Sequence, residues 1–253
     1  MDLHLNGARV LVTGGTRGIG RAIVEAFADE GAVVEFCARD AGEIKDVEKA
    51  LDARGADVHG VELDVRDGTA LTAWVGAAAG RMGGIDAVVA NVSALAIPDT
   101  EENWYTSFEV DLMHTVRLAM AALPHLEASD NGSIVAISSV SGREADFASG
   151  PYGTMKTAIV GYISGLAFQL AGRGVRANVV SPGNTYFAGG VWNQIEQGNP
   201  ELYSMALELN PTGQMGRPED TARAVVFLSS PVSGRTTGTH LVVDGALTRG
   251  IQL

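Results

Sequence analysis

The stretch Thr13-Gly14-Gly15-Thr16-Arg17-Gly18-Ile19-Gly20 decides the fold of this 253-residue chain. A largely apolar run at 8–12 precedes it and an amphipathic pattern at 21–30 follows it, so the local order is strand, glycine turn, helix. Glycine permits tight turns and close approach of the backbone to a ligand, and the first N–H groups of the helix favour an anion. The expected anion is the pyrophosphate of a dinucleotide.

The spacing of this turn is T-G-x-x-x-G-x-G, which differs from the common fingerprint G-x-G-x-x-G. On the turn alone, a plain strand-to-helix connection is the alternative. The candidate cofactor contacts in the turn are Gly14, Thr16, Arg17, Gly18, Ile19 and Gly20.

The composition indicates a globular protein and excludes several other classes. Hydrophobic residues make up 46% of the sequence, which is ample for a core. A net charge of −12 without any basic run argues against nucleic-acid binding, because phosphate contacts need clustered Lys and Arg. The N-terminal residues do not resemble a signal peptide, and no stretch reaches the roughly 20 apolar residues of a membrane span. The single cysteine, Cys37, suits a reducing compartment, so we expect a soluble cytoplasmic protein with no membrane partner.

Short apolar strands alternate with helical patterns along the chain. The expected strands are 8–12, 33–37, 57–63, 85–90, 133–137, 175–180 and 239–243. After the helix that opens at Gly18, the expected helices are 41–54, 67–80, 104–127, 151–171 and 218–229. This alternation predicts an α/β, doubly wound fold with a seven-stranded parallel sheet and helices on both faces. No linker or repeat divides the sequence, so we expect one dinucleotide-binding and catalytic domain over 1–253, with an irregular region at 184–215.

In such a sheet the ligand lies beyond the carboxyl ends of the strands, so the residues just after each strand are candidates for the site. Ala38, Arg39 and Asp40 follow the second strand. An acidic residue at the end of this strand suits the ribose 2′-hydroxyl of NAD, whereas an arginine suits the 2′-phosphate of NADP. Ala38 occupies the acidic position, and Arg17 can reach the same phosphate, so the pattern favours NADP(H), with NAD(H) as the alternative. Asp40 either bonds a hydroxyl or caps the next helix.

Polar residues also follow the third and fourth strands. Asp64-Val65 comes after the third, where an Asp either accepts a hydrogen bond from an adenine amine or starts the next turn or helix. Asn91 comes after the fourth, where it either ties strands together or lines the cofactor cleft. These three residues are therefore candidate cofactor contacts.

The segment after the fifth strand carries the candidate chemistry. Ser139 comes just after this strand, and Tyr152 and Lys156 lie on one face of the helix that follows, because they are four residues apart. A phenol with its ordinary pKa of about 10 is a poor acid or base at pH 7, and a nearby ammonium favours the phenolate. A tyrosine tuned in this way exchanges a proton with a carbonyl or alcohol oxygen, which a serine hydroxyl orients.

Together these motifs resemble the short-chain dehydrogenase/reductase family over nearly the whole chain, from Gly7 to Val243. The matching motifs are Thr13–Gly20, Asp64-Val65, Asn91, Ser139, Tyr152-Gly153-Thr154-Met155-Lys156 and Ser181-Pro182-Gly183. The resemblance implies a Rossmann-like fold and an NAD(P)-dependent oxidoreductase of class EC 1.1.1.-, acting on a small carbonyl or alcohol substrate.

The resemblance also implies a role for each matching residue. Ser139 holds the substrate oxygen, and Tyr152 is the general acid in reduction and the general base in oxidation. Lys156 tunes Tyr152 and bonds the nicotinamide ribose, while Pro182 and Gly183 pass the nicotinamide face. Members of the family are usually tetramers, so a homotetramer or homodimer is expected through the helices at 104–127 and 151–171 and the last helix and strand.

Three departures from the family pattern stand out. After the fourth strand only Asn91 of the usual Asn-Asn-Ala-Gly is retained, and Ser93 is expected to narrow the cleft beside the nicotinamide. Asp111 stands where the family has a catalytic Asn; it keeps an acceptor, loses the amide donor, and is expected to hold Lys156 protonated. Phe187 stands where the family often has a Thr, so Thr185 is the candidate for that cofactor contact and Phe187 is expected to face substrate.

The region 184–215 matches the substrate lid of the family, and its aromatic content predicts a moderately apolar substrate. The candidate substrate contacts are Ser93, Ser141, Phe187 and Trp192. The five histidines show no metal-ligand spacing, so no metal is assigned. The leading hypothesis is a ketone or carbonyl reductase, or a secondary-alcohol dehydrogenase. The alternatives are a 3-oxoacyl reductase, against which the lack of a basic docking patch counts, and a non-catalytic dinucleotide-binding sensor.

Overall fold

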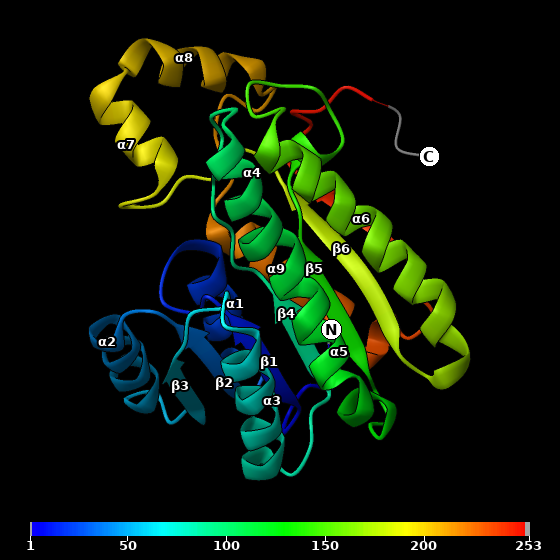
Figure 1. Ribbon diagram of the computed structural model, residues 1–253. Helices are drawn as coiled ribbons and strands as arrows, with labels where there is room; N and C mark the ends of the chain where they lie inside the picture. Colours follow the sequence, from blue (N-terminus) through cyan, green and yellow to red (C-terminus); the bar gives the residue numbers. More distant parts are fainter. Residues whose placement is uncertain (1, 251–253) are drawn as a thin grey trace.

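The computed structural model describes residues 2–250, whose strands form a seven-stranded parallel sheet (Figure 1). Residues 1 and 251–253 of the predicted domain lie outside the described part. The strands are β1 (Arg9–Thr13), β2 (Val33–Ala38), β3 (Val58–Glu62), β4 (Ala87–Ala90), β5 (Ser133–Ile137), β6 (Arg176–Pro182) and β7 (His240–Val243). Their order is β3-β2-β1-β4-β5-β6-β7, and this confirms the fold class expected from the sequence.

The strand order reverses at β1, which pairs with β2 on one side and with β4 on the other. A reversal of this kind opens a crevice at the carboxyl edge of the sheet, where ligands of doubly wound proteins bind. The glycine turn leaves β1 at this edge, and Asn91 follows β4 beside it. The fold therefore brings the two motifs together although 78 positions separate Thr13 from Asn91.

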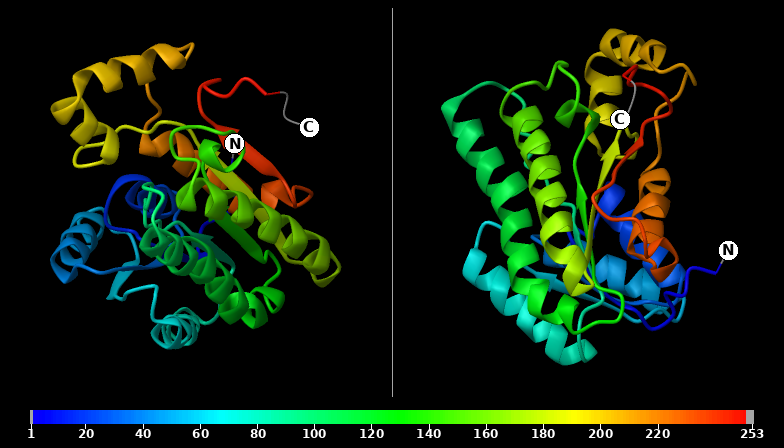
Figure 2. Two further views of the ribbon diagram at one scale, coloured as in Figure 1. Left: turned by 45° about the horizontal axis from the view of Figure 1, so that its top comes forward. Right: turned by 90° about the vertical axis from the view of Figure 1, so that its right-hand side faces the viewer.

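Helices cover both faces of the sheet (Figure 2). On one face α1 (Gly18–Asp29), α2 (Ala41–Asp52) and α9 (Pro218–Ser229) build a hydrophobic core with the sheet. On the other face α3 (Gly68–Met82), α5 (His114–Glu127) and α6 (Pro151–Leu170) build a second core. The central strands β4 and β5 are buried along their whole length, which explains their continuous apolar sequences. No helix among residues 2–250 is long and apolar enough to cross a membrane.

The single helix expected at 104–127 is wrong, because three segments occupy this region. They are α4 (Glu101–Ser107), a π-helical segment (Phe108–Met113) and α5. Thr100 caps the first of them by accepting a hydrogen bond from Asn103 N at 3.3 Å, so the region begins earlier than expected. Polar and apolar residues alternate with helical spacing through all three segments, so the sequence pattern does not reveal the wider π turn.

The irregular structure expected at 184–215 is also wrong, because two helices form there, α7 (Val191–Gly198) and α8 (Pro200–Leu209). Pro200 lies at the start of α8, where its missing N–H costs nothing, and the Asn199 side chain caps the helix by accepting a hydrogen bond from Leu202 N. The glycines and the proline that suggested an irregular region therefore mark helix ends. Both helices lie together at the top of Figure 1, beyond the layers that cover the sheet.

Candidate functional site

The glycine turn has the geometry needed to receive an anion. Gly14 has φ +74°, and a Cβ added to Gly20 would overlap the carbonyl oxygen of Gly14, so both positions require glycine. Helix α1 begins at Gly18, and its first turn carries no acidic side chain that would compete for the free N–H groups. Arg17 occupies the N-cap position without a side-chain capping bond. A backbone cradle, a helix N-terminus without acidic side chains and an arginine at the N-cap position fit the pyrophosphate of a dinucleotide.

The structure shows which of the two predicted roles Asp40 has. Asp40 caps α2, accepting hydrogen bonds from Gly42 N at 2.8 Å and Glu43 N at 2.9 Å. Its carboxylate is therefore used by the helix. Among the described residues, neither Arg17 nor Arg39 forms an ion pair with a carboxylate.

The edge of the turn also carries two carboxylates. Thr16 Oγ1 donates a hydrogen bond to Glu43 Oε2 at 2.7 Å, which ties the glycine turn to α2. Asp64 pairs with Arg66 at 2.6 Å, and this hydrogen bond lowers the pKa of the Asp64 carboxyl, with a smaller contribution from the nearby charge of Arg39. Val65, the next residue, is buried. Arg39 thus lies near the end of β3, on the side expected for the adenosine half of a dinucleotide.

Asn91 connects β4 to the start of the glycine turn. Its Nδ2 donates to the carbonyl oxygens of Thr13 at 3.0 Å and Gly14 at 3.3 Å, and its backbone N donates to Thr13 Oγ1 at 3.0 Å. Of the two roles left open by the sequence, the structure shows the tie between strands. Asn91 also lies at the crevice, and its contact with the cofactor stays a prediction.

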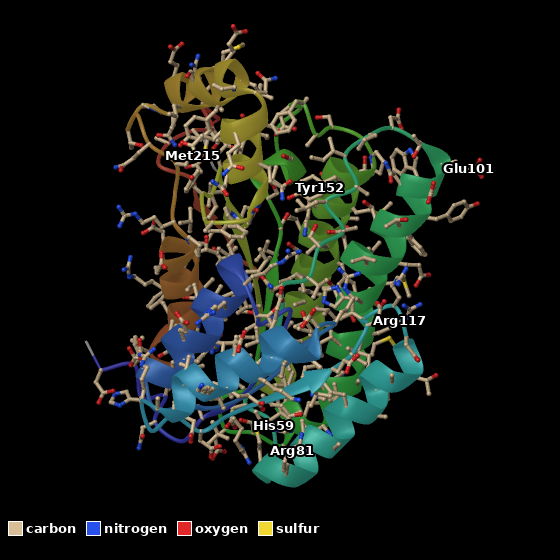
Figure 3. The ribbon with its side chains drawn as sticks, turned by 90° about the vertical axis from the view of Figure 1, so that its left-hand side faces the viewer. His59, Arg81, Glu101, Arg117, Tyr152 and Met215 are labelled. Carbon is tan, nitrogen blue, oxygen red and sulfur yellow. The ribbon has the colours of Figure 1, made fainter. Side chains whose placement is uncertain are left out.

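The catalytic candidates converge where β5 ends and α6 begins. Lys156 is only 2% exposed, and its Nζ donates to the carbonyl oxygen of Ile137 at 3.1 Å and lies 5.6 Å from the centroid of the Tyr152 ring. Ser139 is nearly buried, and its Oγ accepts a hydrogen bond from Ser141 N at 3.2 Å. Pro151 opens α6 and places Tyr152 in the first helical turn. Figure 3 shows Tyr152 on the side of the molecule that carries α7 and α8, at the end opposite His59 and Arg81.

Asp111 forms a buried ion pair with the candidate lysine. Its carboxylate is completely buried, and Oδ1 lies 3.1 Å from Lys156 Nζ while Oδ2 accepts a hydrogen bond from Ala94 N at 3.3 Å. The residue belongs to the π-helical segment, and such segments occur often at functional sites. Asp111, which stands where the family has an Asn, therefore contacts Lys156 directly.

His114, to which the sequence assigned no role, lies three residues after Asp111 and contacts the start of the glycine turn. Its ring is completely buried, and burial lowers the pKa of the imidazole from its ordinary 6.5 to about 4. Its Nε2 lies 3.0 Å from Thr13 Oγ1, at the start of the glycine turn. The only signal in the sequence was its position three residues after Asp111.

The residues after β6 lie close to the glycine turn and to the lid. Pro182 ends β6, and a Cβ on Gly183 would meet the Asp244 side chain, so the backbone passes β7 closely. Thr185 Oγ1 donates to the carbonyl oxygen of Gly183 at 3.0 Å. Phe187 lies against the glycine turn, since a Cβ built on Gly18 would be 2.6 Å from Cζ of its ring. The ring therefore covers part of the N-terminal end of α1, and its contact with substrate stays a prediction.

Trp192 belongs to a small hydrophobic cluster in the region 184–215, which the sequence predicts to be a substrate lid. Its buried ring packs with Ala206 and Met215, and it meets the Phe147 ring edge to face with centroids 6.2 Å apart. Phe147 lies in the loop between Ser139 and α6, and its role was missed because a lone aromatic in a polar loop carries no pattern. This pair joins the lid to the loop beside the catalytic candidates.

Two other candidate substrate contacts are hydrogen-bonded within their own loops. Ser141 Oγ donates to Asp146 Oδ2 at 2.6 Å, and Ser93 Oγ accepts from Leu95 N at 3.2 Å. Ser93 is half-buried, beside the segment that carries Ala94 and contacts Asp111. The contact of Ser93 and Ser141 with substrate stays a prediction.

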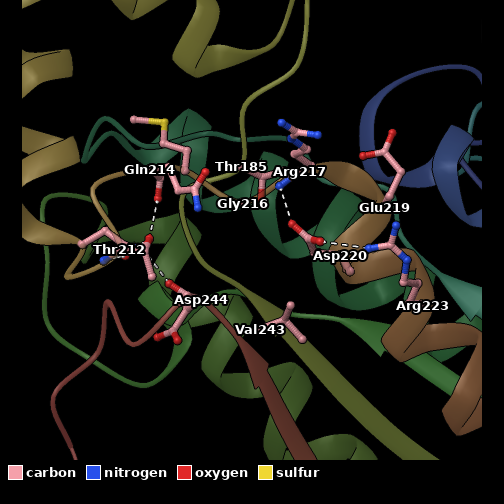
Figure 4. A pocket seen from close by; sticks show the side chains of 14 residues that line it. Thr185, Thr212, Gln214, Gly216, Arg217, Glu219, Asp220, Arg223, Val243 and Asp244 are labelled. Atoms are coloured by element: carbon pink, nitrogen blue, oxygen red, sulfur yellow. Dashed lines mark hydrogen bonds and ion pairs between the residues drawn. The ribbon is translucent and has the colours of Figure 1, made fainter.

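A pocket of about 480 Å³ lies behind the lid, between its last residues, α9 and the end of β7 (Figure 4). Thr185 is among its lining residues, whereas Ser139, Tyr152 and Lys156 are not. Among its charged residues Asp220 pairs with Arg223 at 3.1 Å and accepts a second hydrogen bond from the backbone N of Arg217 at 2.9 Å. Within residues 2–250 no group of three or more His, Cys, Asp or Glu side chains could hold a metal ion.

Comparisons with known proteins show to which proteins this chain is similar. The family model described as enoyl-(acyl carrier protein) reductase matches residues 14–248. The isoepoxydon dehydrogenase of Penicillium expansum is 38% identical over 98% of this chain and 97% of that protein. The 3-oxoacyl-(acyl-carrier-protein) reductase of Vibrio cholerae is 30% identical over 97% and 99% of the two chains. The crystal structure of gox2181 superposes with a TM-score of 0.89 at 28% identity and covers 97% of each chain.

Proposed function

Because this chain belongs to the short-chain dehydrogenase/reductase family and is an oxidoreductase acting on CH–OH or C=O groups, we propose that it interconverts a small ketone and a secondary alcohol. The observation that carries the proposal is the cluster of Tyr152, buried Lys156 and nearby Ser139 at the edge of the sheet where the glycine turn lies. The family uses NAD(P), and the glycine turn fits such a dinucleotide.

In the proposed mechanism the protein handles the proton. The bound nicotinamide supplies or accepts the hydride. Tyr152 gives a proton to the substrate oxygen during reduction and takes it back during oxidation. The ammonium of Lys156 contacts Ile137 O and Asp111 and lies 5.6 Å from the centroid of the Tyr152 ring, so it places a positive charge beside the tyrosine. The Ser139 hydroxyl orients the substrate oxygen and stabilises the charge that develops there.

NADP(H) is proposed as the preferred dinucleotide. Two observations support this preference: Arg17 is the N-cap residue of α1 and Arg39 follows β2 with its charge near Asp64, and no carboxylate among the described residues pairs with either arginine. Three carboxylates lie near these arginines, and each accepts hydrogen bonds from another group: Asp40 from α2, Glu43 from Thr16 and Asp64 from Arg66. NAD(H) remains the alternative.

The decisive experiment is a panel of ketones and secondary alcohols, including isoepoxydon, assayed with NADPH, NADH and their oxidised forms. Absorbance of the reduced nicotinamide reports activity and cofactor choice together. Tyr152→Phe is expected to lower turnover by about 10²- to 10⁴-fold while it leaves dinucleotide binding intact. Full activity of Tyr152→Phe would refute the mechanism, and binding without turnover by the wild type on the whole panel would favour a sensor.

A 3-oxoacyl substrate is the second candidate, supported by the likeness to the reductase of Vibrio cholerae. The net charge of −12 counts against docking of an acidic carrier protein. Activity on a carrier-bound 3-oxoacyl group that exceeds activity on free ketones would decide for it.

The region 184–215 is proposed as the substrate lid, and an assembly of two or four copies is proposed through the surface of α5 and α6. Met120 on α5 is 68% exposed and Phe168 on α6 is 89% exposed, which is unusual for large apolar side chains. Sedimentation of the wild type against Phe168→Asp tests this assembly; identical molar masses would contradict it. A cytoplasmic location also remains a proposal.

A further inference from the structure

The π-helical segment Phe108–Met113 and the histidine that follows it touch both halves of the proposed site. Asp111 contacts Lys156, on the catalytic side. Three residues later, His114 contacts Thr13, the first residue of the glycine turn. One short stretch of chain therefore contacts both Lys156 and the side chain of Thr13, the first residue of the glycine turn.

The protonation of His114 follows from its partners. Nδ1 lies 2.7 Å from the carbonyl oxygen of Val110, which only accepts hydrogen bonds, so Nδ1 carries the proton. Burial lowers the pKa of the ring to about 4, so the imidazole is neutral at pH 7 and Nε2 is an acceptor. Thr13 Oγ1 therefore donates its proton to Nε2 at 3.0 Å, in preference to the carbonyl oxygen of Val89 at 3.3 Å.

These hydrogen bonds form a chain in which each group accepts from the one before it and donates to the next. The backbone N–H of Asn91 donates to Thr13 Oγ1, Thr13 donates to His114 Nε2, and His114 Nδ1 donates to Val110 O. Hydrogen bonds in such a chain polarise one another and strengthen in a low dielectric. The same Asn91 holds the carbonyl oxygens of Thr13 and Gly14 through its side chain. The orientation of the first residues of the glycine turn thus depends on a ring that belongs to α5.

We propose that His114 is a positioning residue for the dinucleotide, which fixes the glycine turn through Thr13 and links it to the segment that holds Lys156. The inference rests on the proposed dinucleotide binding, and His114 touches neither the dinucleotide nor the substrate in this role. Its expected signature is a change in dinucleotide affinity that exceeds any effect of a general loss of stability.

The test compares three variants by fluorescence titration with NADPH and NADH. His114→Leu keeps an apolar side chain of similar size and removes both bonds, so it weakens dinucleotide binding by about five- to tenfold. His114→Gln offers an amide oxygen to Thr13 and recovers most of the affinity. Leu118→Ala, on the same helix and in the core beside α5, lowers stability and leaves the affinity unchanged.

A cycle with Thr13→Val completes the test. If His114 acts through Thr13, the double variant Thr13→Val/His114→Leu binds no more weakly than the poorer single variant. Equal affinity of His114→Leu and wild type, or equal losses in His114→Leu and Leu118→Ala, would overturn the inference. Failure of the wild type to bind either dinucleotide would instead refute the proposed function on which the inference rests.

Discussion

The floor and the lid of the proposed site are stabilised in different ways. The floor comprises the ends of β1, β4 and β5, the π-helical segment with His114, and the start of α6. Its polar side chains Asp111, His114 and Lys156 are buried; Asp111 and Lys156 form an ion pair, and His114 is hydrogen-bonded to Thr13 and Val110. The lid, residues 184–215, has a small core of Trp192, Ala206 and Met215.

This difference separates two properties of the enzyme. A network of buried polar groups allows few arrangements, because any unpaired member costs free energy. A lid with a small core opens and repacks at little cost. We therefore expect the floor to determine the reaction and the dinucleotide, and the lid to determine which substrate enters.

Loss of the buried ion pair between Asp111 and Lys156 is expected to destabilise the floor more than any other change. Asp111→Ala leaves the ammonium of Lys156 without its carboxylate, and the expected loss in free energy of unfolding is about 3–5 kcal/mol, measured by urea denaturation. Asp111→Asn keeps an oxygen acceptor, so we expect substantial activity with a shifted pH profile of turnover. The matched control is Glu109→Gln, whose partly exposed pair with Arg117 contributes at most about 1 kcal/mol. An unchanged pH profile in Asp111→Asn would contradict the proposed influence on Lys156.

The second test of the floor uses the acid dependence of stability. His114 has a pKa of about 4 in the folded protein and about 6.5 when unfolded, so the unfolded chain binds more protons between these values. Stability is therefore complete above pH 6.5 and falls as the pH drops toward 4, by about 3 kcal/mol from this group alone. His114→Gln should lose that part of the pH dependence, while His125→Gln, on the same helix, should keep it. Parallel curves for wild type and His114→Gln, from urea denaturation at several pH values, would refute the assignment.

The sequence predicted much of the floor and little of the lid. The parallel sheet followed from alternating apolar strands and helical patterns, and the glycine turn from spacing that only glycine satisfies. The contact between His114 and Thr13 spans 101 positions and depends on the π turn, which no local pattern reveals. The helices of the lid were missed because Gly190, Asn199 and Pro200 suggest a loop until their positions at helix ends are known.

The affinity for NADPH is expected to depend on the positive charge of Arg39. Arg39→Ala removes a cation from the proposed 2′-phosphate position, and we expect the affinity for NADPH to fall by about tenfold and that for NADH by less than about twofold. Titration by calorimetry measures both. Arg66→Ala is the matched control, because this exposed arginine pairs with Asp64 nearby. Equal losses of NADPH and NADH affinity in Arg39→Ala would refute the preference for NADP(H).

The lid should show the smallest effect, and on a different kinetic constant. Phe147→Ala removes the edge-to-face contact with Trp192, and such aromatic pairs contribute about 0.5–1.5 kcal/mol. Because the contact joins the lid to the loop before α6, we expect KM for the substrate to rise about two- to tenfold while kcat and the dinucleotide affinity stay constant.

Met205→Ala is the control for this last test, since that side chain is exposed on α8 and makes no aromatic pair. The combination of Phe147→Ala with Trp192→Leu should raise KM no further than the poorer single variant, because both changes remove the same contact. A fall in kcat or in dinucleotide affinity with Phe147→Ala would show that lid and floor are coupled. In that case the contact between the Phe187 ring and Gly18 is the route to examine, since it is the point where the lid touches the glycine turn.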